Sequence, residues 1–157
     1  MEDVGFEHEP KRAVGKLASI VISNGCNNFC AFCIVPFSRG RERSRASGEI
    51  LHEVREAVKA GKTEVMLLGQ NVNSYGADFL MEKIKEGAEY ELPGGKKVKP
   101  VMVKHLGRHR IPTLFTHLLE AVAEIPGVEK VMFLSANPWD FSDELIDTIA
   151  RHSNIDR

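Results

Sequence analysis

Three cysteines, Cys26, Cys30 and Cys33, lie within eight residues, and the chain has no others. Their spacing, Cys-x3-Cys-x2-Cys, places three thiolates on one short loop, enough to bind three irons of a [4Fe–4S] cluster. Clusters that only transfer electrons usually have a fourth cysteine, so its absence indicates an open iron at which a substrate or cofactor binds. The motif therefore predicts chemistry carried out at an iron–sulfur cluster.

Other uses of three cysteines explain the pattern less well. Disulfides would leave one thiol unpaired, and the acidic first five residues do not resemble a secretory signal. A zinc ion needs a fourth ligand, which His8 or His52 could supply, although zinc ribbons usually use two separated Cys-x2-Cys pairs. Inert buried thiols are unusual among Asn and Gly residues. We expect the cluster and keep zinc as the alternative.

Composition places the chain among ordinary globular domains. It has 157 residues, of which 43% are hydrophobic and 27% charged. The net charge of −1 gives no sign that the whole molecule binds nucleic acid, so any such site must come from local clustering. No apolar run approaches the ~18 residues of a membrane span. We therefore expect a cytoplasmic protein without a membrane partner.

The hydrophobic pattern predicts an α/β fold. Buried strands are expected at 17–22, 63–69 and 129–134. Helices are expected after Ser47 and Ser142, each acting as an N-cap, and over 114–125. Strands that alternate with helices form a parallel sheet, whose ligands bind at the carboxyl ends of the strands, where the cysteine loop begins. Residues 1–16 are interpreted as a linker, and Trp139 and Phe141 as core residues.

Residues 77–112 do not resemble a plain connection between a strand and a helix. Two helical turns are expected over 79–86, and the segments 89–92 and 98–103 flank Pro93-Gly94-Gly95 as in a hairpin. The segment is basic, with Lys96, Lys97, Lys99, Lys104, Arg108 and Arg110. We interpret it as a solvated insertion and keep an RNA-facing patch as the alternative.

Two polar stretches follow the first two predicted strands. Arg39, Arg41, Arg43 and Arg45 alternate, so in an extended segment they would project from one side and could clamp a phosphate or carboxylate. An ordinary solvated loop is the alternative. The amides of 70–73 (Gln-Asn-Val-Asn) follow the second strand and could position a polar ligand beside the cysteines, although such residues are also common in turns.

The cysteine loop, with Phe32 before its last cysteine, resembles the signature of radical S-adenosylmethionine enzymes. Residues 24–37, with Arg39-Gly40-Arg41 and Ser44-Arg45, are similar to the methylthiotransferases among them. The stretch 67–75, Leu-Leu-Gly-Gln-Asn-Val-Asn-Ser-Tyr, resembles the branch that acts on tRNA. Residues 135–138, Ser-Ala-Asn-Pro, are similar to a Ser-His-Pro stretch of this family, with Asn in place of His. The resemblance covers about residues 10–157, apart from the insertion.

This resemblance implies a fold, an activity and partners. Residues 17–157 would form the first half of a (β/α)6 partial TIM-like barrel, with three parallel βα units and an inserted hairpin-like segment at 77–112. The enzyme would add a methylthio group to carbon 2 of N6-isopentenyladenosine in tRNA, next to the anticodon. One electron from the [4Fe–4S] cluster would cleave S-adenosylmethionine. The implied partners are tRNA, S-adenosylmethionine and an electron donor such as flavodoxin or ferredoxin.

The resemblance also assigns residues. Cys26, Cys30 and Cys33 would bind the cluster, Phe32 would lie near the adenine of S-adenosylmethionine, and Gln70 and Asn71 near its amino group. Arg39, Arg41, Arg43 and Arg45 would contact the cofactor carboxylate or the tRNA backbone. Members of the family also carry an auxiliary-cluster domain, a second half-barrel and an RNA-binding domain, so we expect an inactive fragment. A methylthiotransferase of a ribosomal protein and a non-enzymatic zinc-binding RNA module are the alternatives.

Overall fold

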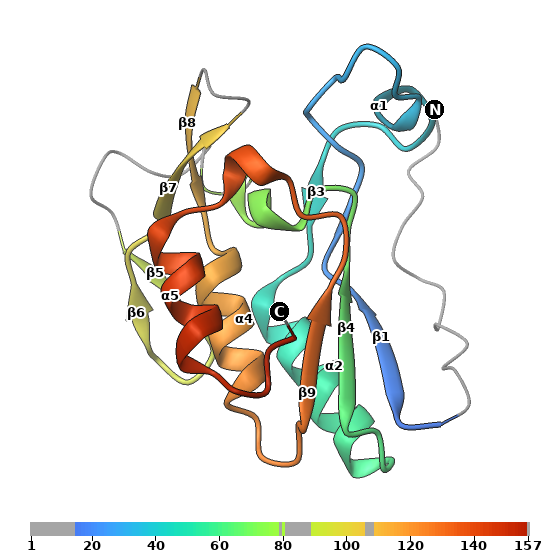
Figure 1. Cartoon of the computed structure of the whole chain (residues 1–157), viewed down its shortest axis with the longest axis vertical. Coiled ribbons are helices and arrows are strands. Elements are labelled where there is room, and N and C mark those ends of the chain that lie inside the picture. The colour runs from blue at the N-terminus through green and yellow to red at the C-terminus, as the bar shows by residue number, and fades with distance from the viewer. Residues whose placement is uncertain (1–14, 79, 81–88, 106–108, 157) are drawn as a thin grey trace.

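Three parallel strands form the central sheet of this protein. The computed structural model describes residues 15–78, 80, 89–105 and 109–156. The strands β1 (Leu17–Val21), β4 (Glu64–Leu68) and β9 (Lys130–Phe133) lie in the order β1-β4-β9. All three predicted strands are confirmed, each slightly shorter than expected. Because the strands are parallel, the segments that follow them emerge at the same edge of the sheet (Figure 1).

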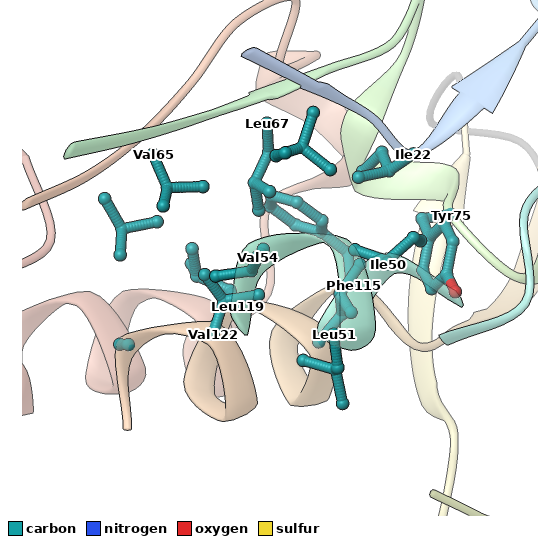
Figure 2. Packing of buried hydrophobic residues seen from close by; sticks show 14 of the residues in the cluster. Ile22, Ile50, Leu51, Val54, Val65, Leu67, Tyr75, Phe115, Leu119 and Val122 are labelled. Carbon is teal, nitrogen blue, oxygen red and sulfur yellow. The ribbon is translucent and has the colours of Figure 1, made fainter. Parts of the chain in front are cut away.

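Helices cover one face of this sheet. The helix α2 (Ser47–Lys59) connects β1 to β4, α4 (Phe115–Ala123) precedes β9, and α5 (Asp143–Arg151) follows it. Figure 2 shows Val65 and Leu67 of β4 above Val54 of α2 and the apolar side chains of α4. These three side chains are fully buried. Burial of each such side chain contributes about 1.5–3 kcal/mol, so this shared core fixes the strands and their ends in place.

The ends of the helices differ in how well the sequence predicts them. The Ser142 hydroxyl accepts a hydrogen bond from the Leu145 amide at 3.1 Å, which confirms Ser142 as the N-cap of α5. The expectation for Ser47 is wrong, because the N-cap of α2 is Ala46 and Ser47 is the first helical residue. The Ser47 side chain is buried rather than exposed at a helix end, since α2 begins against the rest of the protein.

Two hairpins lie between the second and third strands of the sheet. The first pairs β5 (Tyr90–Glu91) with β6 (Lys97–Val98) around Pro93-Gly94-Gly95, which confirms the turn and the first arm of the predicted hairpin. The predicted second arm, 98–103, is wrong beyond Val98, because residues 101–103 pair with β8 instead. The second pairs β7 (Val101–His105) with β8 (His109–Thr113) and is not predicted, since proline within β8 is unusual in a strand. The helical turns expected over 79–86 fall, except for residue 80, outside the described residues.

Short elements follow the sheet strands at their shared edge. After β1 come β2 (Ser23–Asn24), α1 (Val35–Ser38) and β3 (Arg43–Ser44). The 3-10 turn η1 (Val72–Ser74) follows β4. A second turn, η2 (Pro138–Asp140), follows β9. The hairpin β7–β8 contacts both turns, which places it beside this edge of the sheet (Figure 1).

Aromatic residues near η2 correct one expectation about the core. The side chains of Trp139 and Phe141 are 50% and 38% exposed, so neither is a core residue. The buried residue of this turn is instead Asp140, whose carboxylate has partners inside the protein. No helix among the described residues is long and apolar enough to cross a membrane.

Candidate metal centre

The three cysteines surround a hollow of about 240 Å³ at the carboxyl ends of the strands. Residues from the loops that follow all three strands line it: Cys26, Asn28, Phe29, Cys30, Cys33 and Pro36 after β1, Gln70 after β4, and Ser135, Ala136 and Asn137 after β9. The structure therefore brings together three predicted site residues of one loop and the predicted Gln70, which lies 37 residues further along the chain. It also adds residues 135–137, which the sequence associates with the family but not with this site.

Close backbone packing shapes the cysteine loop. Gly25 has a φ of +74°, and a Cβ atom at this position would lie 2.2 Å from the carbonyl oxygen of Arg41. The Cys26 amide donates to the Gly40 carbonyl at 3.3 Å, and β2 pairs with β3 through Asn24 and Arg43. The chain therefore returns against the first cysteine, and only glycine at position 25 allows this approach.

Burial distinguishes Cys26 from the other two cysteines. Its side chain lies largely out of solvent, whereas Cys30 and Cys33 are half-buried. Burial raises the pKa of the Cys26 thiol, a hydrogen bond from the Asn28 backbone lowers it, and the Glu42 carboxylate and the other two cysteines raise it further. The raised pKa favours the protonated thiol of Cys26 in the metal-free chain. A metal ion favours the thiolate instead, because a coordinated thiol loses its proton.

Two residues that line the hollow each have a buried amide oxygen without a hydrogen-bond partner in the described part of the chain. Gln70 Oε1 and Asn28 Oδ1 are buried acceptors, and neither has a partner among the residues that the structure describes. A buried polar atom without a partner costs about 1–3 kcal/mol, so such atoms usually indicate a missing ligand or water. Both acceptors suit a group that donates hydrogen bonds, such as the amino group of an amino acid.

Strained backbone also concentrates at this hollow. Phe29 and Ser135 have φ values of 46° and 64°, in the left-handed region that residues with a side chain rarely adopt. They come from different loops, yet both line the hollow. Strained residues of this kind cluster at binding sites, where the surrounding structure fixes them. The strain therefore marks the same place as the cysteines and the unpaired amides.

Amides after β4 bind the loop after β9. The side chain of Asn71 donates to the Asp140 carboxylate at 2.8 Å, and both residues are 1% exposed. Asn73 Oδ1 accepts from the Asn137 amide at 2.6 Å, and the Val72 amide donates to the Ser135 carbonyl at 3.3 Å. The Asn71 side chain thus faces Asp140, while Gln70 faces the hollow. No local signal identifies Asp140, because its partner is 69 residues away.

A second buried carboxylate lies below the cysteine loop. Glu42 is 4% exposed, and the Ser74 hydroxyl lies 2.7 Å from both of its carboxylate oxygens. The Glu42 amide donates to the Asn27 side chain at 3.2 Å, so Glu42 connects the cysteine loop to η1. The alternating arginines conceal this residue in the sequence, since an acid between them resembles an ordinary surface charge.

The four arginines do not form one row. Arg45 donates to the Val21 carbonyl and to the Glu53 carboxylate, both at 2.8 Å, so it attaches the loop to β1 and α2. Arg39, Arg41 and Arg43 are exposed. The expected common side is therefore wrong for Arg45, because β3 has only two residues and the extended segment ends before it.

Phe32 projects away from the protein. Its side chain is 95% exposed and does not line the hollow. Phe29, Ile34 and Phe37 are also more than half exposed, so the outer side of the cysteine loop is apolar. An apolar surface of this kind is typical of a place where a ligand or partner binds.

The distances between ligand atoms bear on the two metal sites considered from the sequence, an iron–sulfur cluster and a zinc ion. In the described part of the chain, one group of metal-ligating side chains has all its ligand atoms within 4.8 Å of one another, namely Glu120, Glu124 and His152. The cysteines are more widely spaced than this. Thiolates on one tetrahedral zinc ion would lie about 3.8 Å apart, given Zn–S bonds of about 2.3 Å. His52 is exposed on α2, and His8 lies outside the described residues.

Comparison with known proteins places these features in a family. The model of the Radical SAM superfamily matches residues 20–157. The chain is 40% identical over 151 residues to the tRNA-2-methylthio-N(6)-dimethylallyladenosine synthase of Staphylococcus epidermidis, covering 96% of this chain and 24% of that protein. It is 40% identical to the synthases of that name from Moorella thermoacetica, over 145 residues, and Thermotoga petrophila, over 138 residues.

These alignments cover 92% and 88% of this chain, and 26% and 24% of the two relatives. The chain thus spans about a quarter of the length of the curated relatives that it matches. The family match, in contrast, extends over most of the chain and includes all three cysteines, β4, β9, the end of β1 and the loops that line the hollow. The chain therefore belongs to the Radical SAM superfamily.

Proposed function

We propose that this chain is the cofactor-binding part of a methylthiotransferase that modifies tRNA. Its substrate would be N6-isopentenyladenosine next to the anticodon, which receives a methylthio group at carbon 2. The names of these relatives, which are synthases of 2-methylthio-N6-dimethylallyladenosine in tRNA, support the reaction. The observation that carries the proposal is the hollow itself, where three cysteines and two unpaired amide acceptors meet.

The residues present fit the cofactors of this family. Cys26, Cys30 and Cys33 would bind three irons of a [4Fe–4S] cluster and leave the fourth iron open. When bound, the cluster supplies the electron that cleaves S-adenosylmethionine. Gln70 and Asn28 would accept hydrogen bonds from the amino group of that cofactor, because both residues line the hollow and each has a buried amide oxygen without a partner.

Other residues would orient the cofactor or shield it. Phe32 would lie against its adenine, since its side chain is 95% exposed and therefore accessible to a ligand. Asn71, which the family resemblance places at the amino group, would act by holding the loop at 135–140 through Asp140. Arg39 and Arg41 remain candidates for the cofactor carboxylate or the RNA backbone, with Arg43 beside them.

The proposal includes a partial barrel over residues 17–157, with residues 1–16 as a linker. The edge of the sheet supports it, because the backbone of Ile155 forms a parallel bridge with Val131 next to β9. The face of the sheet opposite the helices also supports it. That face is half-buried and borders a hollow of about 500 Å³ that includes Met66 and Met132. Further parallel strands would extend the sheet at this edge.

Electron supply and location complete the proposal. An external donor such as flavodoxin or ferredoxin would reduce the cluster, since the chain offers no other redox group than its cysteines. A reducing, cytoplasmic compartment would keep these thiols available to bind iron.

Anaerobic reconstitution with iron and sulfide tests the site. We expect about four irons and four sulfides per chain, with broad visible absorption that is lost when Cys26, Cys30 or Cys33 is replaced by alanine. His52→Ala is the matched control and should retain the cluster, because this side chain is exposed on α2. Retention of iron by the triple alanine variant, or stoichiometric zinc in place of iron, would refute the proposal.

Substrate choice requires the intact parent enzyme. It should be offered isopentenylated tRNA and the ribosomal protein that a sister branch modifies, and each should be assayed for methylthio groups. We expect modification of the tRNA, because the amides after β4 add no negative charge near a phosphate backbone. Modification of the protein alone would transfer the assignment to the sister branch.

A further inference from the structure

The basic insertion has an unusual distribution of charge. The 28 residues from Leu92 to Leu119 contain six Lys or Arg residues and no Asp or Glu. The whole chain has a net charge of −1, so the rest of the chain is acidic. Segregation of this kind produces a local positive field on a molecule that has almost no net charge, and such a field attracts polyanions.

Within this insertion, the hairpin β7–β8 places two cations opposite each other. Lys104 and Arg110 are direct cross-strand neighbours, and both side chains are exposed. Neither forms an ion pair within the part of the chain that the structure describes. Like charges directly opposite each other destabilise a hairpin. The arrangement becomes favourable when an anion lies between or above the two side chains.

The neighbouring hairpin shows the ordinary alternative. In β5–β6, the cross-strand neighbours are Glu91 and Lys97, which carry opposite charges. The two hairpins of this segment thus differ in the charges that they pair. The like-charge pair is in β7–β8, the hairpin that contacts the turns η1 and η2. This contrast argues against a merely solvated surface for β7–β8.

The position of this hairpin connects it to the metal centre. The Thr113 hydroxyl, at the end of β8, lies 2.6 Å from the Asn73 carbonyl, to which it donates. Asn73 belongs to η1, which follows Gln70, and β7 contacts η2, which follows the loop at 135–137. The hairpin therefore stands beside the edge of the sheet where the cysteine loop emerges (Figure 1).

An exposed aromatic residue accompanies the cations. Trp139 lies in η2, the turn that β7 contacts, and half of its side chain is exposed. The contact between β7 and η2 therefore brings an element with an exposed cation and a turn with an exposed aromatic residue together. Surfaces that bind unpaired RNA typically combine the two, since phosphates meet cations and bases stack on aromatic rings. An acidic protein partner would use the cations but has no need of the ring.

We propose that the β7–β8 hairpin binds the RNA substrate through its phosphate backbone, with Lys104 and Arg110 as the contacts and Trp139 as a stacking platform. This inference rests on the proposed function and names the element that grips the RNA beside the metal centre. The cost of the like-charge pair in the free protein is offset when phosphate is bound. The hairpin thus exchanges some stability for affinity.

Binding of a fluorescently labelled RNA stem-loop with an unpaired, adenosine-containing loop tests the proposal. Anisotropy titrations at several salt concentrations should compare the reconstituted chain with Lys104→Gln/Arg110→Gln. We expect the slope of log affinity against log salt to decrease by about 1.5, because each lost phosphate contact removes roughly 0.7–0.9. The matched control is Arg55→Gln/Lys59→Gln, which removes two exposed positive charges from α2 and should leave the slope unchanged.

A single charge reversal separates binding from folding. Lys104→Glu gives the hairpin a Glu–Arg pair like that of β5–β6, so its melting temperature should equal or exceed that of the parent chain while RNA affinity decreases. Equal loss of affinity in both double variants would overturn the proposal, as would variants that bind RNA like the parent. Competition by an acidic flavodoxin that depends on Lys104 and Arg110, with RNA binding unaffected, would overturn it too.

The readouts distinguish this inference from the proposed function. Cleavage of S-adenosylmethionine depends on the cysteines and should be unchanged in all the hairpin variants. If the variants leave RNA binding intact while cleavage requires the cysteines, the hairpin assignment fails and the proposed function stands.

Discussion

Two adjacent amides at the end of β4 differ in what they contact. Gln70 lines the hollow with an unpaired oxygen, whereas Asn71 is buried and donates to Asp140. A strand-like alternation explains the difference, since successive side chains point in opposite directions. One residue therefore faces a ligand and the next faces the protein, although both amides are equivalent in the sequence.

Alanine substitutions should separate these roles. Gln70→Ala should leave the free energy of unfolding within about 0.5 kcal/mol but weaken S-adenosylmethionine binding roughly tenfold or more, since a hydrogen bond to a charged group is lost. Asn71→Ala should lower the free energy of unfolding by about 1–3 kcal/mol, because it removes a donor from a buried carboxylate. Urea unfolding and equilibrium dialysis of the reconstituted chain measure both quantities. Identical profiles for the two variants would contradict this division.

Tyr75 gives the chain a pH dependence at high pH. Its ring is fully buried and its hydroxyl donates to the Arg45 carbonyl at 2.7 Å. Burial raises the pKa of Tyr75, so the folded chain keeps the phenol protonated after the unfolded chain has begun to ionise. Stability from this group is therefore complete below the ordinary pKa of about 10 and is lost as pH rises above it.

Tyr75→Phe should reveal this loss. At pH 7 the variant should be less stable by about 1 kcal/mol, because the hydrogen bond is removed. Above pH 10 the parent should lose about 1.4 kcal/mol per pH unit through this group, so the difference should shrink and then reverse. Cys26 acts in the same sense in the metal-free chain, but it is common to both proteins and cancels in the comparison. Unfolding by urea from pH 7 to 11 measures the difference, and a constant gap would contradict the assignment.

At the scale of elements, the cysteine loop depends on how closely β3 returns to it. Gly25→Ala would place a methyl group 2.2 Å from the Arg41 carbonyl oxygen and 2.7 Å from that of Gly40. Because these are backbone atoms, the returning segment must move away, and we expect reconstitution to lose most of its iron. Gly40→Ala is the matched control. Its φ is also positive, at +79°, but a Cβ atom there meets nothing within 4 Å.

The control should therefore lose about 1–2 kcal/mol of stability through backbone strain while it retains the cluster. Iron content and visible absorption after reconstitution measure the first effect, and urea unfolding measures the second. Equal iron content in Gly25→Ala and Gly40→Ala would show that the close approach does not shape the loop.

Elements with a strong local pattern could be predicted from the sequence. The sheet strands have apolar runs, α5 has a Ser142 cap, and the first hairpin has Pro93-Gly94-Gly95. The hairpin β7–β8 could not be predicted, because its buried face has only a few apolar residues in a basic segment with a proline. The contacts of Asp140 and Glu42 could not be predicted either. Their partners lie 69 and 32 residues away, and only the folded chain brings them together.

Over the whole molecule, the residues that could bind ligands lie at one edge of the sheet. The cysteine loop with Asn28, the Gln70 amide and the basic hairpin come from three separate regions of sequence, yet each follows or contacts a loop at the carboxyl ends of the strands. The helices that cover one face of the sheet form the core with it, and this core fixes the strand ends from which these loops begin. Parallel strands make this convergence possible, because all their carboxyl ends point in one direction.

This arrangement also leaves the site open in the chain as it stands. Cys30 and Cys33 are half-buried, Phe32 is 95% exposed, and the hollow opens to solvent. Catalysis that forms reactive species requires exclusion of water, which three strands do not provide. The chain should therefore bind the cofactors without controlling the reaction that they support.

We expect the reconstituted chain, supplied with reductant, to cleave S-adenosylmethionine slowly and to transfer no methylthio group to tRNA. Mass spectrometry of digested tRNA and chromatography of 5′-deoxyadenosine measure the two outcomes in one reaction. Cys30→Ala is the control for cleavage that does not depend on the cluster. Methylthiolated adenosine in tRNA treated with this chain alone would show that the three-stranded sheet shields the reaction after all, and that the half-exposed cysteines become covered when RNA binds.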